Sequence, residues 1–335
     1  LAVLAATWLL LAPEAHAAEV PAPLDAQARA LQRAQRAVLG VQVLAVDDAR
    51  SARTLGRARS GSGVLISTDG LVLTIGYLVL EADQVQLVHD DGRPVPARVV
   101  GYDVATGFGL LQALAPLGLE PAPLGRAESL APEMPLMVAS GGDDGAVSVA
   151  QLVARRPFSG YWEYHLDSAL FTAPPRPDHS GAGLFNSAGE LVGIGSLLVA
   201  DAAGSGTAAP RRSGNMFVPV DLLAPILPDL RRVGHGAASQ RAWLGLNCAE
   251  MEGQIRVLRV NDDSPADVAG IEAGDRILRI DGVAVQSLGA LWQALWAGGA
   301  PEREVQLLIE RAEQQQTLTV HSVDRMKTLK RSQGI

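Results

Sequence analysis

Residues 61–74 read GSGVLISTDGLVLT, two apolar runs separated by a polar turn that ends in glycine. Runs of about four to eight apolar or β-branched residues bounded by turn residues are typical of β-strands. Similar runs recur on both sides of this stretch, and Asp-Asp-Gly at 90–92 marks another turn. Short strands at this spacing predict an all-β barrel or sandwich. The predicted strands are 41–46, 63–66, 71–74, 85–88, 97–100, 108–111, 136–139, 191–198 and 216–220.

Composition changes along the chain indicate further segments. Residues 18–37 contain arginines and apolar residues at helical spacing and predict a short amphipathic helix. Residues 231–241 are rich in Gly and Ala and are interpreted as a linker, and 242–322 alternate predicted strands and helices as a second folded unit. The last segment, 323–335, carries a basic cluster that we interpret as a solvated tail. The cluster consists of Arg325, Lys327, Lys330 and Arg331.

Composition also limits the classes of function. The chain has 335 residues, 48% of them hydrophobic, and 28 basic against 36 acidic residues give a formal net charge of −8. A net-acidic chain is a poor sequence-independent binder of nucleic acid, because such binding depends on a cationic surface. The single cysteine, Cys248, excludes an internal disulfide and a cysteine-clustered zinc site, and we expect it to be buried. No metal-ligand spacing or phosphate-binding glycine loop is found, so neither a metal nor a cofactor is predicted.

The amino-terminal residues 1–17 predict a signal peptide. Leu1 to Ala12 are almost wholly apolar, and the small-residue triplet Ala15-His16-Ala17 follows. This pattern is typical of a secretory signal with its cleavage site, and the run is shorter than the roughly 20 residues of a membrane-spanning helix. We therefore expect an exported, periplasmic protein without a transmembrane span in its mature chain, and a retained anchor is the alternative.

Three local patterns follow one another in a fixed order. They are 61–74; 181–186 (GAGLFN) with 189–194 (GELVGI); and 243–246 (WLGL) ahead of 264–266 (SPA) and 269–275 (AGIEAGD). In this order they resemble the HtrA/DegP trypsin-like proteases with a C-terminal PDZ domain, over nearly the whole mature chain. The resemblance implies a mainly β fold: a chymotrypsin/trypsin-like double β-barrel at 38–230 and a small α+β PDZ domain at 242–322. Function must still be argued from the site, because one fold hosts many functions.

The resemblance also places the catalytic positions of the family on this sequence. In a serine protease triad, a His takes the proton of the nucleophilic Ser and an Asp orients the His. The positions of His, Asp and Ser are held here by Tyr77, Gly107 and Ser180. A phenol, with its usual pKa of about 10, is a poor general base at neutral pH, and glycine has no side chain to orient one. The sequence predicts that only the nucleophile is retained.

The surroundings of Ser180 differ from the family as well. Asp178 stands at the oxyanion-hole position where the family has glycine, and its charge is expected to oppose the negative charge that the hole must stabilise. The proline-rich stretch 173–177 replaces the usual wall of the substrate pocket. His179 is a nearby alternative base, but adjacent side chains usually diverge, so we do not assign it that role.

The PDZ-like unit keeps its binding elements. PDZ domains add an extended peptide to a sheet edge and capture its carboxyl terminus in a nest of backbone N–H groups. The matching loop is Trp243-Leu244-Gly245-Leu246, in which Leu244 and Leu246 are expected to form an apolar pocket. The resemblance therefore predicts that this unit binds the carboxyl termini of proteins or peptides.

A helix predicted at 288–297 should line the other side of this groove. Ser287 precedes it as the expected cap, and Gly298-Gly299 follow as the stop signal. Leu288 and Trp292 are the candidate peptide-binding residues on this helix. The alternative for apolar residues at helical spacing is that they belong to the domain core.

These expectations favour an exported HtrA-like pseudoprotease. It would act as a peptide- or protein-binding scaffold or accessory subunit in envelope protein quality control or assembly. The alternative is a serine endopeptidase of trypsin-like HtrA type with residual or unusual activity that depends on Ser180. A larger envelope complex or a homo-oligomer stays open, because residues 18–37 show no recognisable trimerisation pattern.

Overall fold

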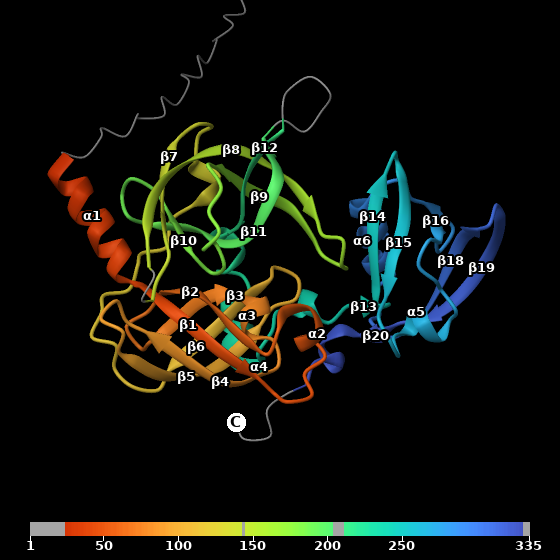
Figure 1. Ribbon diagram of the computed structural model, residues 1–335, viewed down its shortest axis with the longest axis horizontal. Coiled ribbons are helices and arrows are strands. Elements are labelled where there is room, and N and C mark those ends of the chain that lie inside the picture. Colours follow the sequence, from red (N-terminus) through yellow and green to blue (C-terminus); the bar gives the residue numbers. More distant parts are fainter. Residues whose placement is uncertain (1–23, 143–144, 204–210, 331–335) are drawn as a thin grey trace, which may run out of the picture.

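The computed structural model describes residues 24–142, 145–203 and 211–330. They form two β-barrels followed by a smaller unit of strands and helices (Figure 1). No helix in these ranges is both long and apolar enough to span a membrane. The signal peptide predicted at 1–17 lies outside the described residues.

Strands β1 to β6 close the first barrel in the order β1-β2-β3-β6-β5-β4. The stretch 61–74 supplies the end of β2, a turn and most of β3. Gly70 takes a φ of +87° in this turn, and its N–H donates to the Ser67 carbonyl at 3.2 Å. Every residue of β3 is buried, so this strand lies at the centre of the domain. The elements are α1 Leu24–Arg36, β1 Val38–Ala45, α2 Ala52–Leu55, β2 Ala58–Leu65, β3 Leu71–Ile75, α3 Gly76–Val79, β4 Ala82–Val88, β5 Pro94–Tyr102 and β6 Phe108–Ala113.

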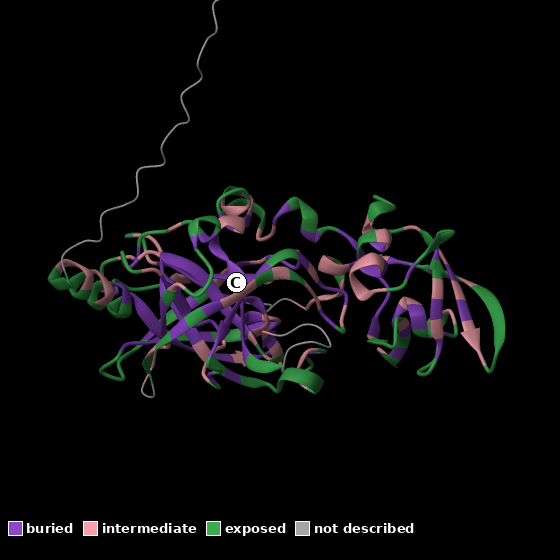
Figure 2. Cartoon of the chain, turned by 90° about the horizontal axis from the view of Figure 1, so that it is seen from above, coloured by how far each residue is buried: buried purple, intermediate pink, exposed green. Residues whose placement is uncertain are grey.

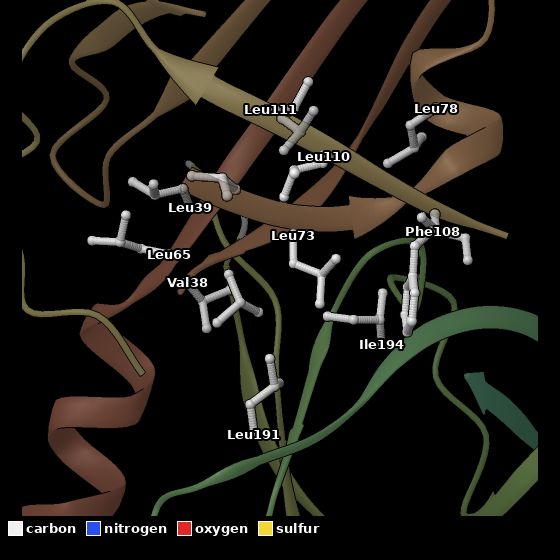
Figure 3. Packing of buried hydrophobic residues seen from close by; sticks show 14 of the residues in the cluster. Val38, Leu39, Leu65, Leu73, Leu78, Phe108, Leu110, Leu111, Leu191 and Ile194 are labelled. Atoms are coloured by element: carbon white, nitrogen blue, oxygen red, sulfur yellow. The ribbon is translucent and has the colours of Figure 1, made fainter. Parts of the chain in front are cut away.

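Strands β7 to β12 close the second barrel in the order β10-β11-β12-β9-β8-β7. One hydrophobic cluster spans both barrels, and the second barrel also has a smaller cluster of its own. Leu191 and Ile194 of the second barrel belong to the same buried cluster as Leu73 and Phe108 of the first (Figure 3). The predicted double barrel is thus confirmed. The elements are β7 Pro135–Ala139, β8 Val147–Ser159, β9 His165–Ala173, β10 Gly183–Phe185, β11 Leu191–Ala203 and β12 Arg212–Pro219.

The third unit has its own core and the architecture expected of a PDZ domain. Its main sheet has the order β14-β15-β16-β18-β19, with β17 paired to β16, and β13 pairs with β20. Helix α6 is Leu288–Ala297, as predicted, and the Ser287 side chain caps it by accepting a hydrogen bond from the Ala290 N–H. Cys248 is buried in β14, as expected. The elements are β13 Ala242–Trp243, β14 Leu246–Met251, β15 Gln254–Val260, α5 Pro265–Val268, β16 Arg276–Ile280, β17 Val283–Ala284, β18 Glu304–Arg311, β19 Gln314–His321 and β20 Val323–Asp324.

Two expectations about connecting segments were wrong. Helix α4, Leu227–Val233, extends into the predicted linker because it ends only at Gly234, which takes a left-handed conformation. The predicted solvated tail is folded through residue 330: β20 pairs with β13, and the Lys330 N–H donates to a Glu81 carboxylate oxygen. Figure 2 shows the burial that results, with buried residues concentrated inside the barrels and the PDZ unit. Arg331 lies outside the described residues.

Candidate active site

The three positions of the family triad lie close together in the structure. Tyr77 is carried by α3, which begins where β3 ends, and Ser180 lies in the turn before β10. The Tyr77 hydroxyl is 2.7 Å from Ser180 Oγ and 2.8 Å from the Ser196 carbonyl oxygen. Gly107 adjoins this site, because its carbonyl accepts a hydrogen bond from the Gly76 N–H at 2.6 Å. The structure thus brings together the three positions that the resemblance assigns to the triad.

The phenol of Tyr77 is a weak base in this environment. Burial raises the pKa of Tyr77 to about 12, and the hydrogen bond with Ser180 opposes this shift. The phenol is therefore protonated at neutral pH. Its single proton can serve only one of its two contacts at a time, and a carbonyl oxygen can only accept. When the phenol donates to Ser196, the Ser180 hydroxyl is left to donate to the phenol oxygen, which does not activate Ser180 as a nucleophile.

The backbone conformation and the surroundings of Gly107 are unfavourable for an orienting carboxylate. Gly107 has a φ of +84°, a conformation in which side-chain-bearing residues are strained. A Cβ at this position would lie 3.0 Å from the hydroxyl oxygen of Tyr164. That hydroxyl is itself fixed, because it donates to the Thr106 carbonyl at 2.7 Å. The Tyr164 hydroxyl would thus have to shift to admit a side chain at position 107.

Asp178 is paired, contrary to the expectation of an unopposed charge at the oxyanion-hole position. Its carboxylate accepts from Arg176 Nε at 3.0 Å and from the Ser140 hydroxyl. Burial alone would raise the pKa of Asp178, but the hydrogen bonds from Arg176 and Ser140 hold it below its usual range.

Arg176 is a buried residue that the sequence reasoning missed. It comes from the proline-rich stretch interpreted as an altered pocket wall, and its side chain donates to the Val138 carbonyl at 3.1 Å and to Ser148 Oγ at 2.6 Å. The Arg176 backbone N–H donates to the Asn215 side chain, and the Arg176 carbonyl accepts a hydrogen bond from it. The stretch therefore anchors the Ser180 turn to the second barrel.

His179 makes its side-chain contact within the same turn. Its Nδ1 lies 3.1 Å from the Arg176 carbonyl oxygen, which can only accept, so Nδ1 carries the proton in this contact. Within the described residues, the hydroxyl of Ser180 is hydrogen-bonded to Tyr77 and not to His179. A second hydrogen-bonded chain, Ser159–His165–Asp167, lies at the end of the β8–β9 hairpin, where Gln293 of α6 also bonds to it.

A side chain of the barrel occupies the loop 243–246, which the sequence predicted to bind a carboxylate. Glu163, in the connection between β8 and β9, accepts hydrogen bonds at Oε1 from the backbone N–H groups of three loop residues. The N···O distances are 3.1 Å for Leu244, 2.7 Å for Gly245 and 3.0 Å for Leu246. Glu163 is buried, and no local sequence pattern marks it.

The other predicted groove residues have mixed placements. Trp292 is fully buried, and its indole N–H donates to the Gly160 carbonyl at 3.1 Å. Leu244 and Leu246 are buried in the core of the PDZ unit, and Leu288 packs partly buried against that core. The Arg325 guanidinium lies 4.8 Å from the centroid of the Trp243 ring. The Trp243 side chain therefore contacts the carboxyl-terminal segment.

Comparison with known proteins agrees with this architecture. A trypsin-like peptidase domain matches residues 61–194, and a PDZ domain matches residues 242–321. A probable periplasmic serine endoprotease DegP-like of Halomonas elongata is 28% identical over 297 residues, covering 79% of this chain and 56% of that protein. The putative serine protease HhoB of Synechocystis sp. is 28% identical over 250 residues, covering 68% and 58%. The chain spans about half the length of the curated relatives it matches.

Solved structures show the same fold. An HtrA-type protease AlgW with decapeptide has a TM-score of 0.54 at 20% identity, covering 89% of this chain and 98% of that one. A serine endoprotease from Yersinia pestis has a TM-score of 0.52 at 24% identity, covering 91% and 99%. The fold and the matched domains define a trypsin-like peptidase domain joined to a PDZ domain. The chain is similar to proteins named as DegP-like and HtrA-type serine proteases.

Proposed function

We propose that this chain is an exported HtrA-like protein that binds protein or peptide carboxyl termini and does not act as a protease. It would serve as a scaffold or accessory subunit in envelope protein quality control or assembly. The observation that carries the proposal is the pairing of Ser180 with the neutral phenol of Tyr77, 2.7 Å away. Export is supported by relatives named as periplasmic endoproteases.

The size of the expected loss supports inactivity. In a serine protease dissected by triad deletion, removal of the His alone cost on the order of a millionfold in turnover, about as much as removal of the whole triad. Ser180 here lacks both the imidazole and the carboxylate, and Tyr164 lies close to the place where that carboxylate would be. Residual catalysis from substrate binding alone would be far below that of an intact enzyme.

The names of the relatives favour a second candidate function. The curated proteins to which this chain is similar are called serine endoproteases, and Ser180 remains in its turn. On this alternative, the chain is a serine endopeptidase in which another group, or the substrate itself, activates Ser180. Cleavage of an unfolded protein that disappears in Ser180→Ala would support this candidate.

Labelling with a fluorophosphonate serine probe separates the two candidates. We expect the purified chain and Ser180→Ala to show the same background labelling, because an unactivated hydroxyl reacts slowly with the probe. Tyr77→Phe is a useful second variant, since it removes the phenol hydroxyl and keeps the ring. Labelling of the parent chain that is lost in Ser180→Ala would show an activated serine and overturn the non-catalytic proposal.

A further inference from the structure

The segment between β8 and β9 lies on the PDZ groove as an added strand. The Cys248 N–H of β14 donates to the Tyr161 carbonyl at 2.6 Å, and Trp162 forms an antiparallel bridge with Asn247. On the other side of the groove, Trp292 of α6 donates to the Gly160 carbonyl. A stretch of the barrel is therefore held between the strand and the helix that line a PDZ peptide site.

The end of this added strand places a carboxylate in the carboxylate-binding loop. The segment runs antiparallel to β14, so it advances from Tyr161 toward the loop that precedes β14. At the loop, the Glu163 side chain accepts from the N–H groups of Leu244, Gly245 and Leu246. Gly245 has a φ of +89°, which lets three successive N–H groups point to one oxygen. A bound carboxyl terminus would use the same direction and the same donors.

We propose that residues 160–163 are an internal ligand of the PDZ groove, with the Glu163 side chain standing in for a terminal carboxylate. An external protein carboxyl terminus then binds only by displacing this segment. The inference rests on the proposed peptide-binding function and adds the way in which that site is kept closed. The class of competing partner follows from the chemistry of the loop: an extended chain that ends in a free carboxylate.

The energetics of the contact allow such competition. A buried carboxylate is costly unless it is hydrogen-bonded. Burial raises the pKa of Glu163, and the three backbone N–H groups and Arg325 oppose that shift. An incoming carboxylate would regain the same hydrogen bonds while Glu163 returned to water. The internal segment has the advantage of a high effective concentration, because it is tethered to the groove.

Neighbouring contacts fix the segment in this position. Trp162 stacks on Tyr164 with ring centroids 5.6 Å apart and an interplanar angle of 15°. Gln293 of α6 bonds to His165 and Asp167 just beyond the segment. Figure 1 shows the β8–β9 hairpin extending from the second barrel toward α6 and β14. Release of Glu163 would therefore loosen the contact between the barrel and the PDZ unit.

Hydrogen exchange in the full chain tests the internal contact. Glu163→Ala removes the carboxylate, Glu163→Gln keeps the shape without the charge, and Glu304→Ala removes an exposed carboxylate in the PDZ unit as the matched control. We expect at least tenfold faster exchange of the backbone amides of 244–248 in Glu163→Ala, a smaller increase in Glu163→Gln, and no change in Glu304→Ala. Equal exchange in all four proteins would overturn the proposal.

Peptide capture tests the competition. The probe is a pool of decapeptides with free carboxyl termini, randomised in the last four residues, and a carboxamide pool is its control. We expect Glu163→Ala to retain at least tenfold more of the free-carboxyl pool than the parent chain or Glu304→Ala, and no protein to retain the carboxamide pool. Equal retention by the parent chain and Glu163→Ala would overturn the internal ligand and leave the peptide-binding function standing. No retention by any variant, with exchange accelerated at 244–248, would instead overturn the peptide-binding function, and with it the competition.

Discussion

The Ser180 site and the carboxylate-binding loop are each filled by a side chain of this chain, but in different ways. Tyr77 forms a neutral hydroxyl pair with Ser180, and it sits at the family's own base position. Glu163 brings a negative charge from the β8–β9 connection to the loop of another domain. On the proposed function, the first replacement removes the general base from the Ser180 site, and the second leaves the backbone donors of the loop in place and pairs them with a side chain of the same protein.

The largest expected effect concerns the buried charge that holds the Ser180 turn. Arg176→Ala would leave the Asp178 carboxylate without its cation and the Val138 carbonyl without its donor. Breaking a buried pair by removing one partner costs about 3–5 kcal/mol. We expect a loss near the lower end, because the Asp178 side chain is 36% exposed. Urea unfolding measures the loss. Arg126→Ala, which breaks the exposed pair with Glu128, is the control and should change stability by less than about 1 kcal/mol.

The stability of Arg176→Ala shows whether the Ser180 turn has a structural role. A large loss for Arg176→Ala would mean that the Ser180 turn is retained for its contribution to the folded barrel. A loss as small as that of the Arg126→Ala control would contradict the structural role of Arg176. Stability would then not explain why the turn carries Ser180, and residual catalytic activity of Ser180 would be the next explanation to test.

The second prediction is that restoring two triad residues does not restore a protease. Tyr77→His with Gly107→Asp supplies a base and a carboxylate, but the new Cβ at 107 would lie 3.0 Å from the Tyr164 hydroxyl. Tyr164→Phe removes that oxygen and leaves the nearest ring carbons at 3.5 Å. General acid–base catalysis contributes about 10²–10⁴-fold. We expect the triple variant to cleave fluorescent casein at least tenfold faster than the double variant.

The matched control for this series is Ser180→Ala in the triple variant, which should abolish the gained activity. Thermal unfolding of each variant separates a chemical effect from a loss of fold. Suppose that the double and triple variants are equally active and both well above the Ser180→Ala control. That result would contradict the idea that the Tyr164 hydroxyl obstructs a carboxylate at position 107. In that case the barrel lacked only its base and its carboxylate.

The sequence predicted the Ser180 site better than the groove for a physical reason. The resemblance assigned Tyr77, Gly107 and Ser180 from local motifs, and two of these positions adjoin the predicted strands 71–74 and 108–111, whose apolar runs are clear because both strands are buried in the barrel core. Glu163 meets its donors across 81 to 83 residues of chain, so no local spacing marks it. Strands β8 and β9 were not predicted either. The residues of β8 are mostly not buried, so it lacks the apolar run of a core strand.

The third prediction concerns the strength of the hydrogen bond between the Tyr77 and Ser180 hydroxyls. Tyr77→Phe removes the hydroxyl that contacts Ser180 and Ser196, and a net contribution of about 0.5–1.5 kcal/mol is typical of such a hydrogen bond. We expect a loss of stability in that range by urea unfolding. A double-mutant cycle with Ser180→Ala isolates the part due to the Ser180 contact. A coupling above about 2 kcal/mol would show that the pair is not an ordinary neutral hydrogen bond.

The smallest expected effect is a pH dependence at Asp178. Its pKa in the folded protein lies below the usual value, because the hydrogen bonds from Arg176 and Ser140 outweigh the effect of burial. A carboxylate with a lowered folded-state pKa contributes stability above its unfolded pKa of about 3.9, and this contribution is lost as the pH falls through the folded pKa. The stability difference between the parent chain and Asp178→Asn should therefore be constant above about pH 5 and shrink below about pH 4. Urea midpoints from pH 7 to pH 3 measure it, and a difference that grew on acidification would contradict the assigned ion pair. Such a growth would mean that Asp178 is protonated more readily in the fold than in the unfolded chain, as burial without Arg176 would produce.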